Sequence, residues 1–294
     1  MRSPGSTLKP FLYALALDDG LIHSESLLVD APQSFSGYQP GNFQAGFSGP
    51  VSVAQALQKS LNVPAVHTLV MVSPDAFHKQ LVKLGLPLKE SGDFYGYSLA
   101  LGSAEVSLLN LTKAYRALGN GGRTSPVVFQ PAGKVAAGSP AIDPGAAFIV
   151  GDILSDPLAR ARTFGPDSVL STRFWTAVKT GTSKDMRDNW AVGYSRRYTV
   201  GVWVGNASGA AMQAVSGTTG AAPVWAEVMQ HLHRDTPSLA PAGPTGLVHA
   251  DVRFGRQTEA PRQEWFLAGT QQALFSVDGA TETGLGSAKI TSPV

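Results

Sequence analysis

Residues 3–13 read SPGSTLKPFLY, and the spacing of Ser6 and Lys9 in this stretch is the first indication of the fold. On a helix, residues three apart lie on the same face, with Cβ atoms about 5–6 Å apart. A Pro-Gly pair before Ser6 suits a turn into a helix, and Pro10 is tolerated only in a first turn. The stretch predicts that Ser6 lies at a helix N-terminus, where backbone N–H groups favour negative charge on its oxygen.

Lys9 is placed to act as the base that a serine nucleophile requires. A free lysine has a pKa of about 10.4, so it is protonated at neutral pH and cannot take a proton from Ser6. Burial together with a second cation lowers a lysine pKa by up to about 3–5 units. An active Ser6 therefore requires a second positive charge near Lys9.

Lys179-Thr180-Gly181-Thr182, at the end of a strand-like run, supplies that charge. The Lys179 ammonium would disfavour protonation of Lys9 and would attract a substrate carboxylate. Gly181 would let a substrate backbone approach the strand closely, as glycine in strands often does. We therefore predict that this strand lies beside the nucleophile.

Ser60-Leu61-Asn62 falls between the end of one predicted helix and a second that starts near Pro64. A serine in such a loop can relay a proton to a leaving amine. The Asn62 amide can hold either a substrate amide or the Ser6–Lys9 pair in place.

None of these three motifs is decisive alone. Ser6 by itself is more often an ordinary helix N-cap, Ser60 and Asn62 a polar pair at a helix end, and Lys179 a solvated side chain on a strand. Each motif occurs once, in the order SxxK, SxN, KTG, and each falls in the expected element. That combined set is typical of penicillin-binding proteins and class A β-lactamases.

Composition excludes several other classes of protein. The 294 residues are 43% hydrophobic and 15% charged, which is enough apolar material for a packed core. The formal net charge is +2 with no basic run, so we expect no nucleic-acid partner. No window reaches the roughly 18 apolar residues of a membrane span. The chain has no cysteine and therefore no disulfide, and its six histidines show no spacing typical of metal ligands.

Periodicity indicates an α+β fold, with a helical cluster followed by an antiparallel sheet and a covering helix. Helices are expected at residues 10–19, after Ser52, after Val63, and at 74–85, 104–118, 144–154 and 221–234. Strands are expected at 173–182, 189–194 and 198–206. Residues 20–50 have the composition of a surface loop, residues 236–246 that of a linker, and the last fifty show no clear core of their own.

The chain resembles the transpeptidase domain of class A (bifunctional) penicillin-binding proteins, and within them the penicillin-binding protein 1C group. The stretches that carry the resemblance are SPGSTLKPFLYALALDDGLI, SVAQALQKSLNVPAV, YSLALGSAEVSLLNLTKAYRALGNGG, VKTGTSKDMRDNWAVGYSRRYTVGVWVGN and RQEWFLAGT. They extend over most of residues 2–270. The resemblance implies the serine β-lactamase/DD-transpeptidase fold, in which helices cover an antiparallel sheet.

The resemblance also implies a DD-transpeptidase, which cross-links peptidoglycan stem peptides through an acyl-serine and releases D-alanine. β-Lactams would acylate the same serine. Ser6 would be the nucleophile and Lys9 its base, while Ser60 would pass a proton to the leaving group. Asn62 would orient Lys9 and the substrate amide. Lys179 and Thr180 would support Ser60 and bind the substrate carboxylate. The backbone N–H groups of Ser6 and Thr182 would form the oxyanion hole. The resemblance implies no metal or organic cofactor.

Relative to that family, we expect residues 1–234 to form a transpeptidase domain that lacks its N-terminal sheet strands. Residues 235–294 would be a linker and the start of a C-terminal extension, with the tail AKITSPV as its opening. The family has a membrane anchor and a glycosyltransferase domain before these residues, and it acts at the periplasmic face of the inner membrane. Without the N-terminal strands, the run at about 198–205 is expected to present an open edge.

Alternative functions with the same nucleophile remain. A DD-carboxypeptidase or a β-lactamase resolves the acyl-serine with water, and a β-lactamase needs a loop glutamate to activate it. Glu90 and Glu105 are the nearest after Asn62, and Glu105 is expected in the first turn of a helix, where it complements the dipole without catalysis. A penicillin-acylated sensor or a fragment without turnover is the alternative from another class.

Overall fold

The computed structural model describes residues 1–277 except 44–45, 131–137 and 165–167. The predicted tail AKITSPV lies outside the described residues. The helical elements are η1 Gly5–Leu8, α1 Lys9–Asp18, α2 Val53–Gln58, α3 Asn62–Val72, α4 Pro74–Lys83, α5 Gly92–Tyr95, η2 Gly96–Leu101, α6 Leu108–Gly119, α7 Pro144–Ser155, α8 Pro157–Phe164, η3 Lys184–Met186, η4 Gly217–Ala221, α9 Ala222–Leu232 and η5 Gly255–Gln257. The strands are β1 Leu27–Asp30, β2 Gly49–Ser52, β3 Arg123–Thr124, β4 Ser139–Pro140, β5 Ala177–Thr182, β6 Asp188–Tyr194, β7 Thr199–Gly205, β8 Leu247–Phe254, β9 Arg262–Leu267 and β10 Leu274–Phe275.

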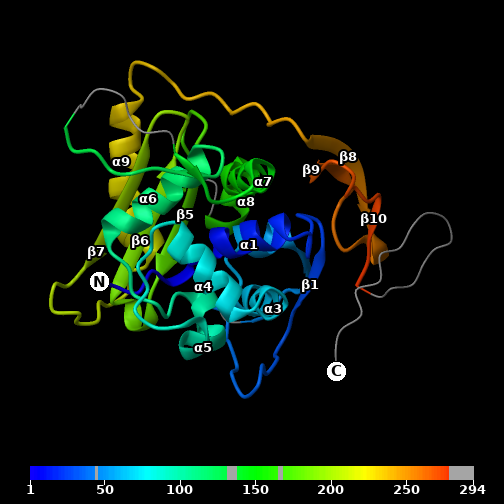
Figure 1. Cartoon of the computed structure of the whole chain (residues 1–294), viewed down its shortest axis with the longest axis horizontal. Coiled ribbons are helices and arrows are strands. Elements are labelled where there is room, and N and C mark those ends of the chain that lie inside the picture. The colour runs from blue at the N-terminus through cyan, green and yellow to red at the C-terminus, as the bar shows by residue number, and fades with distance from the viewer. Residues whose placement is uncertain (44–45, 131–137, 165–167, 278–294) are drawn as a thin grey trace.

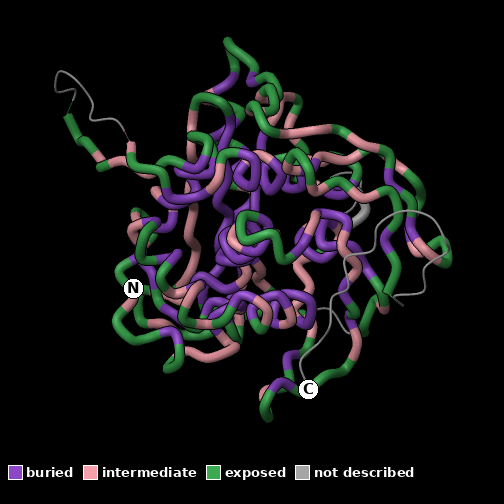
Figure 2. The backbone as a smooth tube through the Cα atoms, turned by 45° about the vertical axis from the view of Figure 1, so that its right-hand side comes forward, coloured by how far each residue is buried: buried purple, intermediate pink, exposed green. Residues whose placement is uncertain are grey.

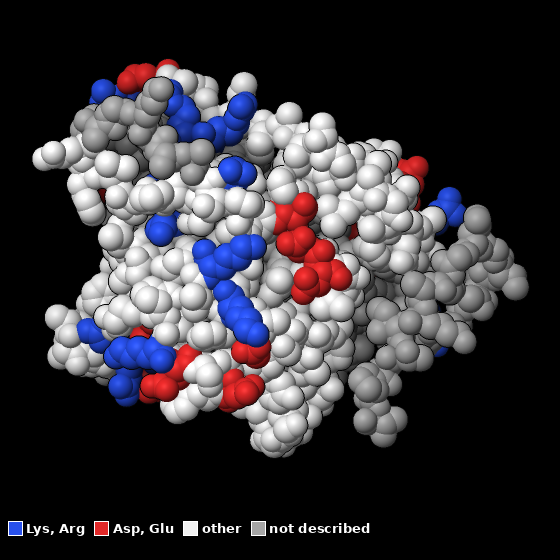
Figure 3. Space-filling model, viewed as in Figure 1, with Lys and Arg blue, Asp and Glu red and all other residues white. Residues whose placement is uncertain are grey.

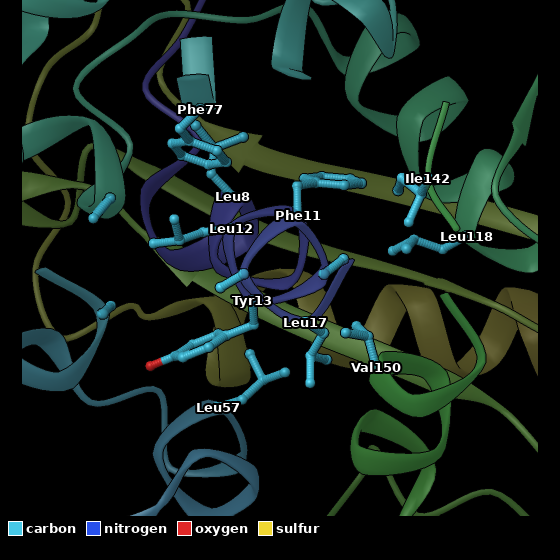
Figure 4. Packing of buried hydrophobic residues seen from close by; sticks show 14 of the residues in the cluster. Leu8, Phe11, Leu12, Tyr13, Leu17, Leu57, Phe77, Leu118, Ile142 and Val150 are labelled. Carbon is cyan, nitrogen blue, oxygen red and sulfur yellow. The ribbon is translucent and has the colours of Figure 1, made fainter. Parts of the chain in front are cut away.

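Helix α1 is the centre of the core. Its sequence KPFLYALALD is apolar on nearly every side, as expected of a helix surrounded by other elements. Figure 4 shows side chains of α1 pointing in different directions toward other elements. The labelled residues are all at most 4% exposed, and they are Leu8, Phe11, Leu12, Tyr13 and Leu17 against Leu57, Phe77, Leu118, Ile142 and Val150. The residue that opens this helix, Lys9, is therefore held in a rigid, water-poor environment.

The central sheet is antiparallel with strand order β5-β6-β7. Strand β6 is buried along its whole length. Its Trp190 lies opposite Gly181 of β5 on one side and opposite Trp203 of β7 on the other. Helix α9 covers one face through Trp225, while α1, α6 and α7 lie toward the other (Figure 1). The α+β prediction, with its hairpin turn at Ser195, is confirmed.

Strand β7 is an edge strand in the part of the chain that the structure describes, where it pairs with β6 alone. All of its residues are half-buried, because helices cover its faces but no strand covers its outer side. The predicted open edge is thus observed at Thr199–Gly205.

Three of the predicted boundaries are wrong. Strand β5 begins at Ala177 rather than at Arg173. Residues 20–50 are not only a surface loop, because β1 pairs antiparallel with β2 and ends in the buried Asp30. Helix α6 begins at Leu108 rather than at Ala104. Val106 forms an antiparallel bridge with Arg2 and so lies outside the helix. Ser107 then caps the helix, because its hydroxyl accepts a hydrogen bond from the Asn110 N–H.

The last described residues form a three-stranded sheet of order β10-β8-β9, so the expectation that they lack a core is wrong. Four buried residues fill one face, namely Val252, Phe254, Phe266 and Phe275. The sheet lies at the far end of the molecule from β7, joined by a segment without helix or strand that crosses the top in Figure 1. The predicted division at residue 234 stays a prediction.

Arg262 of β9 attaches this sheet to the rest of the fold. Its guanidinium contacts three carboxylates, those of Glu25, Glu259 (Nη1 to Oε2, 2.7 Å) and Glu264 (Nε to Oε1, 2.6 Å). Glu259 in turn accepts hydrogen bonds from the backbone N–H and hydroxyl of Ser52, the N-cap of α2, at 2.7 and 3.1 Å. The sheet is therefore bonded to the helix that leads to the Ser60 motif.

Buried residues concentrate in the centre of the molecule, and the connecting segments are exposed (Figure 2). On the face shown in Figure 3, Lys and Arg side chains lie among Asp and Glu, and most of the surface carries neither. None of the described helices has both the length and the apolar character needed to cross a bilayer.

Candidate active site

Ser6 lies on the short 3-10 turn η1 that precedes α1, as the sequence predicts, and its side chain is half-buried. Neighbouring backbone carbonyls are fixed by long-range hydrogen bonds. The Trp190 indole N–H donates to the Ser3 carbonyl (2.8 Å), and the Tyr115 hydroxyl donates to the Thr7 carbonyl (2.7 Å). The turn that carries the hydroxyl is thereby held by the central sheet and by α6.

Lys9 begins α1, one turn beyond Ser6, and is fully buried. Its Nζ donates to the backbone carbonyl of Ser60 (2.7 Å) and to Oδ1 of Asn62 (2.7 Å). The SxxK and SxN motifs therefore meet in space, as predicted. Leu8 and Pro10, on either side of Lys9, are also buried, so the Lys9 amine is removed from solvent and depends on these two protein acceptors.

Ser60 follows α2 in a left-handed conformation, with φ of 58°. That position, just beyond a helix C-terminus, is usually taken by glycine. A non-glycine residue held there stores strain of about 1–3 kcal/mol, as is common at functional sites. The Ser60 hydroxyl accepts a hydrogen bond from Lys179 Nζ (2.7 Å), while its carbonyl faces Lys9. One residue thus joins the two lysines.

Both lysines have depressed pKa values. The pKa of Lys9 lies well below its usual value because of burial first and the Lys179 charge second, with Asp30 acting in the opposite direction. Burial alone lowers the pKa of Lys179 to about 7. The predicted like-charge effect is present, but loss of hydration is the larger cause. Burial and the Lys179 charge therefore both favour the neutral amine at Lys9.

Strand β5 carries the KTGT motif next to the nucleophile turn. The side chains of Thr180 and Thr182 are half-buried, and the Thr180 carbonyl accepts from Lys179 Nζ (3.0 Å). A Cβ placed on Gly5 would lie 2.7 Å from the Thr182 carbonyl oxygen. The backbones around Ser6 and Thr182, which the resemblance assigns to the oxyanion hole, are therefore close neighbours.

The structure shows a reason for glycine at position 181 that the sequence did not suggest. A Cβ at Gly181 would lie 2.5 Å from the Pro4 carbonyl oxygen and 2.7 Å from Thr7 Cγ2. Glycine is required there because the strand packs against the protein's own nucleophile turn. The predicted approach of a substrate backbone to Gly181 stays a prediction.

Asp30 and Asn42 belong to the site and were missed from the sequence. Asn42 accepts a hydrogen bond from the backbone N–H of Asn62 (2.8 Å) and donates to the buried carboxylate of Asp30 (2.9 and 3.0 Å). Both residues lie in the Gly- and Pro-rich stretch that resembles a surface loop. The apolar run before Asp30 is the only local signal for a buried strand there.

The two glutamates considered for water activation are exposed and lie outside these contacts. Glu90 follows α4 in a loop, and Glu105 precedes α6 instead of lying within its first turn, which corrects the sequence interpretation. Among the described residues, no group of three or more His, Cys, Asp or Glu side chains is arranged to hold a metal ion.

Comparison with known proteins assigns this geometry to a family. The family model "Penicillin binding protein transpeptidase domain" matches residues 1–230. The chain belongs to the penicillin-binding protein transpeptidase family. The resemblance and the fold class predicted from sequence are both confirmed.

Two curated members of this transpeptidase family show the extent of the likeness. Penicillin-binding protein 1C of Escherichia coli (strain K12) is 41% identical over 229 residues, which are 78% of this chain and 29% of that protein. Penicillin-binding protein 1A of Neisseria lactamica is 32% identical over 277 residues, 86% of this chain and 34% of that protein. The chain thus spans about a third of the length of these relatives.

Solved structures of the family have the same fold. Penicillin-binding protein 1A of Haemophilus influenzae superposes with a TM-score of 0.76 at 22% identity, over 91% of this chain and 48% of that chain. PonA1 of Mycobacterium tuberculosis in complex with penicillin V superposes with a TM-score of 0.67 at 22% identity, over 82% and 71% of the two chains.

Proposed function

We propose that the chain is a peptidoglycan DD-transpeptidase domain that works through an acyl-serine and is acylated by β-lactams. The observation that carries the proposal is the bonding of Lys9. A neutral amine has two N–H groups and one lone pair, and both N–H groups are taken by the Ser60 carbonyl and Asn62 Oδ1, each at 2.7 Å. The lone pair is left to accept the proton of Ser6, one helical turn earlier.

In the proposed acylation, Ser6 Oγ forms a bond to the carbonyl carbon of a terminal D-Ala-D-Ala peptide while its proton passes to Lys9. The backbone N–H groups of Ser6 and Thr182 would stabilise the oxyanion, and one such donor is typically worth about 2.7–4 kcal/mol of barrier. The C–N bond then breaks, and the departing D-alanine amine takes a proton delivered through the Ser60 hydroxyl.

In the second half-reaction, an amine of a neighbouring stem peptide attacks the acyl-serine and restores the Ser6 hydroxyl. The same proton route runs in reverse through Ser60, whose hydroxyl is held by Lys179. Lys179 and Thr180 would bind the carboxylate of the donor peptide, with Gly181 and Thr182 along its path. No metal or organic cofactor enters this mechanism.

The activity of the whole protein is part of the same proposal, because the chain spans about a third of its curated relatives. We place that protein at the periplasmic face of the inner membrane, attached through an N-terminal anchor. Stem peptides and β-lactams are its proposed partners.

The proposal is tested by incubating the purified chain with a fluorescent penicillin and separating it on a denaturing gel. We expect stable labelling that is lost in Ser6→Ala and retained in Ser3→Ala, a matched control whose hydroxyl only bonds the Gly102 carbonyl (2.7 Å). A chain that never labels although its near-UV spectrum shows a packed fold would refute the proposal.

A second measurement separates the transpeptidase from hydrolytic relatives. A peptide ending in D-Ala-D-Ala is supplied with an acceptor amine, and D-alanine, aminolysis product and hydrolysis product are quantified. We expect aminolysis to exceed hydrolysis. Exclusive hydrolysis of the peptide would indicate a carboxypeptidase, and rapid loss of penicillin label would indicate a β-lactamase.

A further inference from the structure

Asp30 is a buried carboxylate outside all three motifs. It ends β1 with 0% of its surface exposed. Its oxygens accept hydrogen bonds from Asn42 Nδ2 (2.9 and 3.0 Å) and from the backbone N–H of Ser48 (2.7 Å). Burial of a charge is costly unless such partners compensate it, so this carboxylate marks a place where the fold needs an acceptor.

The carboxylate determines which way Asn42 faces. An ionised carboxylate only accepts hydrogen bonds, so the Asn42 amide nitrogen is directed at Asp30 and its oxygen at the opposite side. There Oδ1 accepts the backbone N–H of Asn62 at 2.8 Å. The first residue of α3 is thereby anchored to β1.

Asn62 passes this constraint to the base. Its Nδ2 donates to the carbonyl of Gly41 (2.6 Å), the residue before Asn42, so its Oδ1 is directed at Lys9 Nζ (2.7 Å). The contacts form one directed series from Asp30 through the 41–42 segment and Asn62 to Lys9. Reversal of either amide would bring a donor against a donor.

We propose that Asp30 and Asn42 are positioning residues that fix the orientation of Asn62 and so aim the Lys9 lone pair at Ser6. This inference rests on the proposed acyl-serine function. Asp30 and Asn42 touch no reacting atom; they act through Asn62. The proposal requires that Asn42 donates to Asp30 and not the reverse. A variant in which the donor and the acceptor of this hydrogen bond are exchanged therefore tests it.

The test compares D30N, N42D and the double variant D30N/N42D in the full chain, with penicillin acylation followed by stopped-flow fluorescence. D30N leaves two amides with no carboxylate to orient them, and N42D sets two carboxylates against each other. In the double variant, the amide at position 30 can donate to the carboxylate at position 42, which still accepts from the Asn62 N–H. N42A tests the same series should D30N fail to fold.

We expect each single variant to lower the saturating acylation rate constant by about 10²-fold, because a misplacement of about 1 Å at the base has that effect. The penicillin binding constant should change little, and the double variant should recover to within about tenfold of the unchanged chain. Gln80→Ala is the matched control, since it loses one buried hydrogen bond (Nε2 to the Ala141 carbonyl, 2.8 Å) on α4.

A pH profile gives a readout that mere loosening of the fold would not move. The charged groups that act on Lys9 are Lys179, which lowers its pKa, and Asp30, which raises it. D30N should therefore move the acidic limb of the acylation profile to lower pH, whereas the Gln80 variant should leave the limb in place.

Two outcomes overturn this inference while the proposed function stands: single variants that acylate at the unchanged rate, or a double variant no faster than the slower single variant. Absence of labelling in the unchanged chain would overturn both proposals.

Discussion

Gly181→Ala is a direct test of how closely β5 must approach the nucleophile turn. The added methyl group would lie 2.5 Å from the Pro4 carbonyl oxygen, 2.7 Å from Thr7 Cγ2 and 3.2 Å from Thr7 N. Ordinary contact begins near 3.4 Å, so strand and turn must separate by about 0.9 Å. The nearest atom belongs to the backbone, and the Thr7 side chain is fully buried and donates to the Pro4 carbonyl (2.8 Å), so neither neighbour can move away easily.

The magnitude follows from that separation. Overpacking of this kind costs about 1–3 kcal/mol, partly offset by the roughly 0.5–1 kcal/mol that alanine gains over glycine within a strand. A shift of about 1 Å between Thr182 and Ser6 should also slow acylation by about 10²-fold. We therefore expect a modest loss of stability and a much larger loss of activity.

Thermal unfolding by circular dichroism and penicillin acylation kinetics measure the two effects separately. Gly243→Ala is the matched control, because its added methyl group would find its nearest neighbour at 3.5 Å, an ordinary contact distance. A Gly181 variant with the unfolding midpoint and acylation rate of the unchanged chain would refute the assigned packing role.

Three further predictions concern other parts of the fold. Burial and two neighbouring carboxylates raise the pKa of Glu25 from 4.5 to about 8, so the stability that Glu25 contributes is present below pH 4.5 and is lost as pH rises through 8. E25Q should therefore unfold at a higher temperature than the unchanged chain at about pH 8.5 and at a similar temperature near pH 5. Identical unfolding midpoints of the two proteins at both pH values would contradict this prediction. Ser60→Ala should reduce acylation by about 10²- to 10⁴-fold and should also cost about 1–3 kcal/mol of stability, because buried Lys179 loses an acceptor. A fully active variant would remove Ser60 from the proton route. Trp190→Phe removes the hydrogen bond to the Ser3 carbonyl, whereas the indole N–H of Trp225 has no partner among the described residues. In urea unfolding, Trp190→Phe should therefore lose about 1 kcal/mol more stability than Trp225→Phe. Equal losses of stability would show that the bond to Ser3 adds nothing.

The three motifs could be predicted from the sequence because each is short and each falls in an element with local signals. Pro10 and the apolar run after it indicate α1, and the Ser52 N-cap indicates α2. The β-branched and aromatic residues around Lys179 and Trp190 indicate the sheet. Their meeting in space was inferred from the known chemistry of the motif set, since local periodicity carries no information about it.

The positioning residues could not be predicted, because their burial depends on distant parts of the chain. Asn42 lies in a polar, glycine-rich stretch typical of an exposed loop, and Asp30 follows a short apolar run that does not show that its carboxylate is buried. The carboxylate lies out of water at the end of β1, which pairs with β2. The predicted start of α6 was wrong for the same reason. Glu105 and Val106 fit a helical period, but a bridge to Arg2, about a hundred residues earlier, holds Val106 extended.

The bond between Glu259 and Ser52 has a practical consequence for anyone who trims this chain to a minimal catalytic unit. A cut after α9 would keep the sheet and every motif residue, yet it would remove the only acceptors that the described structure shows for the Ser52 N–H and hydroxyl. It would also expose the carboxylate of Glu25 that Arg262 covers. In a chain shortened in this way, the N-terminus of α2 should be less well ordered and Ser60 should take a wider range of orientations. Weak penicillin labelling of such a chain would then reflect the choice of cloning boundary and not the reactivity of Ser6.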